Sequence, residues 1–270
     1  MKGNSVAVYL ISLSISDLLY TISLPVWIEL ALQRDVSEGL CVAVNLIMYN
    51  SFYAGSGLLC CITVDRYLAV VYPLYFHQVR EVSTAVIVSI AVWILEIIIH
   101  ILLLHHMGAL QASGHLCKQQ TPMAQVDANV ALTRIILGFL VPVIIMTFCF
   151  QQIMQSLKES TSIDNEERRK VGRLLFLLSL TYLVSFVPYQ TVMLLRVILE
   201  LGNCNWANML KDPYLVTVAT TTLNSTLDPI IYCLISDSAK KEIRKAVERG
   251  SKIFTRRECS EISTRIQIVP

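Results

Sequence analysis

Hydrophobic residues in this chain gather into six long runs that are separated by short polar segments. Each run has about 20 residues or more, the length that an α-helix needs to cross roughly 30 Å of hydrocarbon. The connectors between the runs are rich in turn-forming residues and comprise residues 33–39, 77–82, 108–122, 160–169 and 202–213. The pattern predicts an all-α fold, a polytopic bundle of transmembrane helices. The six predicted spans are Val6–Leu32, Val42–Tyr72, Thr84–Leu104, Val126–Leu157, Val171–Glu200 and Tyr214–Leu234.

The composition supports a membrane protein and argues against several other classes. Of the 270 residues, 54% are hydrophobic and 16% are charged, whereas soluble domains carry about 25% charged residues. The formal net charge is only +2, so nothing indicates a nucleic-acid-binding protein. No nucleophile–base arrangement, phosphate-binding glycine loop or metal-ligand spacing stands out. We therefore expect no enzyme, no cofactor and no metal site.

The positive charge is unevenly distributed, and this asymmetry sets the expected orientation. If the second span ends in the cytoplasm, the N-terminus, the connectors 77–82 and 160–169 and the tail after Leu234 are also cytoplasmic. These regions and the adjoining helix ends hold most of the 22 lysines and arginines. The remaining ones are Arg34, Lys118, Arg134, Arg196 and Lys211.

The sequence changes character after the last apolar run. Residues 1–235 are predicted to form the transmembrane bundle. In residues 236–270, basic residues recur together with apolar ones, and this suits an amphipathic helix on the anionic inner leaflet followed by a tail. Cys259 follows the basic stretch, so palmitoylation is expected there.

Two short motifs end apolar runs on the expected cytoplasmic side. Asp65-Arg66-Tyr67 closes the second run, and Asp228-Pro229-Ile230-Ile231-Tyr232 closes the sixth. Further residues of the same pattern are Asp17, Cys41, Trp93, Pro142 and Phe186-Val187-Pro188-Tyr189. Together these residues resemble the rhodopsin-like (class A) G-protein-coupled receptors over nearly the whole chain.

The resemblance implies a register along the family pattern. Asp17 lies in the first run of this chain, whereas the family carries this acid in its second helix. The chain therefore looks like helices two to seven, with the first transmembrane helix missing. A fragment, a truncated gene model and a short isoform remain open, and so does a truncated form that does not signal.

Departures from the common family pattern narrow the resemblance. Phe186 stands where most members have tryptophan, and Asp228 stands where most have asparagine. Both substitutions are similar to those of the proton-sensing receptors, a group with a lysolipid-linked relative. Gln190 departs from that group, because several of its members have histidine at this place.

The resemblance also implies partners and roles. It implies signalling from the plasma membrane to a heterotrimeric G protein, with arrestin and membrane lipids as further partners. It implies a disulfide between Cys41 and Cys117. The residues expected to serve G-protein coupling and activation are Asp65, Arg66, Tyr67, Phe186, Pro188, Pro229 and Tyr232.

Three acids lie within apolar runs, namely Asp17, Glu96 and Asp228. A carboxylate in hydrocarbon is costly, so an intramembrane acid is a functional candidate. The resemblance puts Asp17 and Asp228 on neighbouring helices, where the two acids could share a proton. Outside acidification would then remove their mutual repulsion. The alternative is a structural, sodium-binding role for Asp17.

The histidines provide a second candidate for sensing protons. Glu96 and His100 are four residues apart and share one helix face, so the two groups could titrate as a unit. His100, His105, His106 and His115 fall at or near the outer surface, where protonation would add positive charge. Alternatively, Glu96 bonds a neighbouring helix and the histidines are ordinary solvated residues.

The candidates for ligand contact are Arg134, Tyr189, Gln190 and Arg196. The two arginines lie near the outer halves of their helices and could bind a lipid phosphate or a carboxylate ligand. They could instead pair with acids such as Glu29 or Glu200. The ligand itself stays open between protons, a lysolipid, a nucleotide and a peptide.

Overall fold

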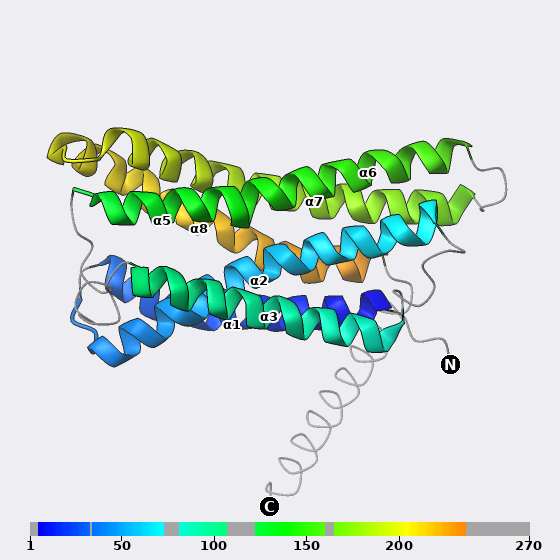
Figure 1. The fold of residues 1–270 in the computed structure, drawn as a ribbon, viewed down its shortest axis with the longest axis horizontal. Helices are drawn as coiled ribbons and strands as arrows, with labels where there is room; N and C mark the ends of the chain where they lie inside the picture. The colour runs from blue at the N-terminus through cyan, green and yellow to red at the C-terminus, as the bar shows by residue number, and fades with distance from the viewer. Residues whose placement is uncertain (1–4, 33, 73–80, 107–121, 160–164, 236–270) are drawn as a thin grey trace, which may run out of the picture. The chain divides into compact units, whose positions relative to one another are not determined.

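The computed structural model describes residues 5–32, 34–72, 81–106, 122–159 and 165–235, and the regular structure in these ranges is entirely helical (Figure 1). Helices are expected here because backbone groups in hydrocarbon must bond within their own segment. The elements in chain order are α1 (Ser5–Ala31), α2 (Glu38–Val71), α3 (Val82–His106), α5 (Gln125–Ile135), the π-helix η2 (Ile136–Leu140), α6 (Val141–Glu159), α7 (Asn165–Leu199) and α8 (Cys204–Ile235).

Five stretches of the described chain are long and apolar enough to cross a membrane. They are Ser5–Leu30, Glu38–Val71, Val82–His105, Gln125–Lys158 and Gly172–Leu199. They coincide with the first five predicted spans, and the all-α helix bundle is confirmed. The sixth predicted span lies in α8 and is less apolar, because Thr220, Thr221, Thr222 and Asn224 interrupt its middle.

The prediction of a polar connector over residues 202–213 is wrong for most of its length. Gly202 has a φ of +68°, a conformation that glycine adopts without steric cost. Asn203 Oδ1 then accepts the backbone N–H groups of Asn205 at 3.1 Å and Trp206 at 3.4 Å. An asparagine that binds these first free donors is a helix N-cap. The next helix therefore starts at once, at Cys204.

The chain divides into two compact units, Met1–Asp228 and Pro229–Pro270. Of the second unit, the structure describes only the end of α8. The bundle, its pocket and its ion pairs belong to the first unit. The boundary predicted at residue 235 stays a prediction, because residues 236–270 lie outside the described ranges.

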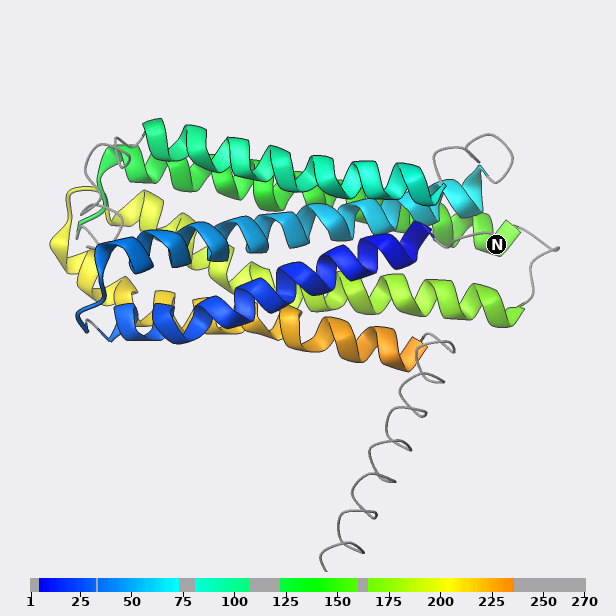
Figure 2. The same ribbon diagram turned by 90° about the horizontal axis from the view of Figure 1, so that it is seen from below.

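Helix α2 is central in the first unit and contacts α1, α3, α6, η2 and α7 (Figures 1 and 2). Helix α1 also contacts α3, where Trp93 Nε1–H donates a hydrogen bond to Ser12 Oγ at 3.1 Å. Helix α3 is the most exposed of the candidate spans, since only 11% of its apolar window is buried. Ile87, Leu95 and Leu102 are each about 60% exposed, so this helix presents apolar surface suited to lipid.

The π-helix η2 provides a polar link between three helices. A side chain at Gly138 would overlap the ring of Tyr53, so α2 approaches η2 more closely than any other residue would allow. Ser56 Oγ donates to the Gly138 carbonyl at 3.1 Å and lies 2.7 Å from the Tyr182 hydroxyl. Ser56 and Tyr182 are both buried. The polar link therefore joins α2, η2 and α7 inside the core.

Candidate functional site

Two carboxylates from opposite ends of the sequence lie buried in the bundle. Asp17 of α1 is 7% exposed and Asp228 of α8 is fully buried, and the charge of Asp17 acts on Asp228. Asn224 Nδ2 donates to Asp228 Oδ2 at 2.9 Å. Three buried oxygens, Asp17 Oδ2, Asn224 Oδ1 and Asp228 Oδ1, accept no hydrogen bond from any described residue. A proton on either carboxyl group would supply a donor to this set.

A second group of charges meets at Tyr49 of α2. The guanidinium carbon of Arg134 lies 4.3 Å from the centroid of the Tyr49 ring, and the His100 ring contacts the same tyrosine at 5.8 Å between centroids. Arg134 also lies 5.8 Å from the Tyr53 ring centroid and within electrostatic range of Glu96 and His100. The structure thus brings Glu96, His100 and Arg134 together, and their titration as a unit stays a prediction.

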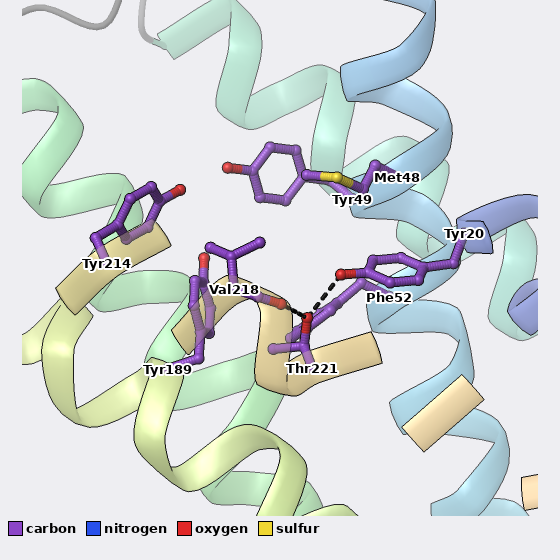
Figure 3. Close-up of a pocket in the computed structure, with 8 residues that line it drawn as sticks. All are labelled: Tyr20, Met48, Tyr49, Phe52, Tyr189, Tyr214, Val218 and Thr221. Carbon is purple, nitrogen blue, oxygen red and sulfur yellow. Dashed lines mark hydrogen bonds between the residues drawn. The ribbon is translucent and has the colours of Figure 1, made fainter. Parts of the chain in front are cut away.

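A small pocket lies between α1, α2, α7 and α8 (Figure 3). Its lining is mainly aromatic and comprises Tyr20, Met48, Tyr49, Phe52, Tyr189, Tyr214, Val218 and Thr221. The hydroxyls of Tyr49 and Tyr214 face each other across it (Figure 3). At its α1 side, the Tyr20 hydroxyl lies 2.6 Å from Thr221 Oγ1. The pocket therefore offers aromatic surface and several hydroxyls to a ligand.

The outer end of α7 carries a buried ion pair. Arg196 Nε and Nη2 donate to Glu200 Oε2 at 2.6 Å and Oε1 at 3.0 Å. The Arg196 guanidinium carbon also lies 4.6 Å from the centroid of the Tyr214 ring. Glu29 is paired with Arg34 instead, at 2.9 Å on the surface. Of the partners left open for Arg196 by the sequence, the structure selects Glu200.

The acid–arginine–tyrosine motif lies near the other end of α2. Arg66 Nη2 is 2.7 Å from Asp65 Oδ2, and Ser5 Oγ donates to Asp65 Oδ1 at 2.7 Å. The Tyr67 ring contacts those of Tyr72 at 5.7 Å and Phe148 at 6.1 Å between centroids. Asp65 therefore holds Arg66 in this conformation, and its role in G-protein coupling stays a prediction.

The other predicted site residues are placed as follows. Phe186 is buried between Phe52 and Tyr182, with both ring centroids at 4.6 Å, and Pro188 lies inside α7. Gln190 is buried, and its Nε2 has no partner among the described residues. His105 is exposed at the end of α3.

Some predicted residues lie beyond what the structure describes. His115, Cys117 and Cys259 fall outside the described ranges, and the side chains of His106, Pro229 and Tyr232 are likewise not described. Cys41 is buried, and its pairing with Cys117 stays a prediction.

Several residues of these sites were missed from the sequence. Asn224 could have been found, because it stands four residues before Asp228 and shares its helix face. Ser5, Tyr20 and Ser56 carry no such signal. Their partners are 60, 201 and 126 residues away in the chain, so only the folded bundle brings them together.

Known proteins match this chain over most of its length. The family model described as 7 transmembrane receptor (rhodopsin family) matches residues 1–232. The chain is 33% identical to G-protein coupled receptor 65 of Homo sapiens over 257 residues, which covers 90% of this chain and 76% of that receptor. It is 31% identical to G-protein coupled receptor 68 of Mus musculus and 30% identical to that of Homo sapiens, each covering 90% of this chain and 67% of the relative. The chain therefore belongs to the rhodopsin family of seven-transmembrane receptors.

Proposed function

We propose that this G-protein-coupled receptor responds to extracellular protons at the plasma membrane. The observation that carries the proposal is the buried pair Asp17 and Asp228. One oxygen of each carboxyl group, together with Asn224 Oδ1, has no described donor. Two neighbouring carboxylates repel each other when both are charged, and one bound proton removes this repulsion. The motif resemblance to the proton-sensing receptors points to the same function.

In this mechanism the proton changes the contact between α1 and α8. A protonated carboxyl group donates a hydrogen bond, so either acid could then bind its neighbour or Asn224 Oδ1. The Tyr20–Thr221 contact at 2.6 Å already joins the same two helices. Acidification therefore tightens one side of the bundle. The resulting shift in helix packing releases Arg66 from Asp65 and opens the cytoplasmic side to the G protein.

Glu96 and the outer histidines contribute a second response. Glu96 lies within electrostatic range of Arg134, whose guanidinium rests on Tyr49. A proton that neutralises Glu96 leaves the positive charge of Arg134 less balanced around this tyrosine. His100 is buried against the same ring, so a second positive charge there is unfavourable. Because Tyr49 lines the pocket, the change at Glu96 reaches the pocket wall. His105, His106 and His115 add charge at the outer end of the bundle.

Several partner assignments belong to the same proposal. A Cys41–Cys117 disulfide ties α2 to the predicted outer connector, residues 108–122. Arrestin binds the activated receptor from the cytoplasm, and a palmitoyl group on Cys259 anchors the tail to membrane lipids.

The test uses transfected cells that express a tagged form of the chain. Surface staining and second-messenger output are measured while the outside pH is stepped from about 8 to 6, the range in which histidines and perturbed carboxyl groups titrate. We expect an output that rises on acidification above that of mock-transfected cells. Good surface staining with a flat response rejects proton sensing for this chain.

A second candidate function is favoured by the aromatic pocket. Its hydroxyls and the neighbouring Arg134 suit an anionic organic ligand such as a lysolipid or a nucleotide, and a peptide is the remaining alternative. In that case, Arg134→Gln would abolish the response to the added ligand at fixed pH, and Asp228→Asn would leave it unchanged. A proton receptor gives the reverse pattern, in which Asp228→Asn changes the pH response most.

A further inference from the structure

Glu200 has a carboxylate with hydrogen bonds to both of its oxygens. It is fully buried and accepts both hydrogen bonds from Arg196. Its Oε1 also accepts the backbone N–H of Met123 at 3.2 Å. The carboxylate thus binds two segments that are 77 residues apart in the sequence.

Met123, whose backbone N–H binds Glu200, lies just before the start of α5. Met123 precedes α5 by two residues and follows the predicted outer connector, which holds His115 and Cys117. Its side chain packs with Ala128, Ala131 and Val197 in a buried cluster. The chain therefore enters α5 while its backbone is bonded to the outer end of α7.

The same ion pair reaches the pocket. The guanidinium group that binds Glu200 lies against Tyr214, and Tyr214 packs on Tyr189 with 6.1 Å between ring centroids. Both tyrosines line the pocket. Met123, Glu200, Arg196 and Tyr214 therefore form a continuous chain of contacts from the start of α5 to the pocket wall.

We propose that Glu200 is a positioning residue that couples the end of the outer connector to α7 and to the Tyr214 wall of the pocket. A displacement at Met123 then moves Arg196 and Tyr214 with it. The coupling goes beyond the proposed function, because it acts whatever ligand or proton the receptor binds. It also gives Arg196 a role in place of direct ligand contact.

Because the Arg196–Glu200 pair is buried, removing one partner should strongly destabilise the structure around it. Removing one partner of a buried ion pair leaves an uncompensated charge or loses hydrogen bonds, and this is strongly destabilising. The chain contains a matched control in Arg34 and Glu29. Their side chains are 65% and 43% exposed, and exposed pairs contribute little.

The experiment measures thiol labelling in isolated membranes from cells that express the full chain, so surface delivery is not required. Met123→Cys keeps the backbone N–H that binds Glu200 and places a thiol where the native side chain is 7% exposed. A membrane-permeant maleimide is added, and labelling of each cysteine is followed by peptide mass spectrometry. The exposed Cys204 and the buried Cys149 are internal references.

We expect Glu200→Gln to raise the labelling rate of the introduced thiol about tenfold or more, as expected for loss of a buried ion pair. Glu29→Gln should change it less than about twofold, and Cys149 should stay protected in both variants. An unchanged rate in Glu200→Gln overturns the proposal. An equal rise at Cys149 also overturns it, because the loosening would then be general.

A double-mutant cycle tests whether Arg196 acts in the same unit. Arg196→Gln alone should raise the labelling rate, and the double variant with Glu200→Gln should show less than the product of the two single effects, as for coupled residues. Multiplicative effects would overturn the coupling. Neither result depends on a proton response, so failure of this proposal and failure of proton sensing are distinguishable.

Discussion

The two most deeply buried acidic sites of this receptor differ in their partners. Asp228 lies beside another carboxylate, and one oxygen of each acid has no described donor. Glu200 is equally buried, yet Arg196 and a backbone N–H occupy both of its oxygens. A bound proton would improve the first site and would break the second. Burial alone therefore does not distinguish the proposed proton site from an ion pair, and the lack of donors is the feature that separates the two.

The largest effect is expected when Glu200 loses its ion-pair partner Arg196. Arg196→Gln leaves the Glu200 carboxylate buried without its cation, and we expect a loss of about 3–5 kcal/mol of stability. Thermal unfolding of the purified receptor in detergent measures this loss. The matched variant Arg34→Gln should lower stability by less than about 1 kcal/mol. Equal effects of the two variants would remove the contrast between the buried and exposed pairs.

The second largest effect is expected for Asp228→Asn, which tests the site where Asp17 and Asp228 lie without a cation. Asn at position 228 is neutral at every pH and supplies an amide donor, so Asp228→Asn imitates the protonated acid. Signalling near pH 8 should rise toward the level of the unmodified receptor near pH 6, or the midpoint should shift by about one pH unit or more. Asp35→Asn, which alters an exposed acid, serves as the control. A midpoint that stays in place would show that this carboxylate is structural.

A smaller effect is expected for Tyr20→Phe, which tests whether the pH response comes from the buried acids or from the contact between α1 and α8. Tyr20→Phe removes the hydroxyl bonded to Thr221, while Thr221 keeps its bond to the Val218 carbonyl at 2.6 Å. We expect a loss of about 1 kcal/mol of stability with an unchanged pH midpoint. The pH titration and thermal unfolding are measured on the same samples. A midpoint shift as large as that of Asp228→Asn would assign the response to the contact between α1 and α8.

The smallest effect is expected at the surface. Glu29→Gln removes the exposed partner of Arg34, and stability should change by less than about 0.5 kcal/mol. Signalling should keep its pH midpoint. A larger change in either measurement would mean that the outer end of α1 contributes to the response. The Glu29–Arg34 pair would then have to be considered together with the two buried sites.

Much of this architecture followed from the sequence. Apolar runs of sufficient length predicted the helices, because hydrocarbon requires internal backbone bonding. The motifs at Arg66 and Asp228 predicted the family, and the intramembrane acids were recognised by their cost. The start of α8 at Cys204 was not predicted, since one left-handed glycine and one capping asparagine replaced the expected connector.

The sequence by itself determined which residues are unusual for a membrane, but the tertiary structure decided their partners. Arg196 had two acids and an unknown ligand as possible partners, and the fold selected Glu200, which the helix geometry places on the same face. Asp17 and Asp228 are 211 positions apart by their numbering, and the packing of α1 and α8 places them within range of each other. The reason is physical. The cost of burying a charge is local to the residue, whereas the donors and cations that offset this cost come from helices distant in the chain.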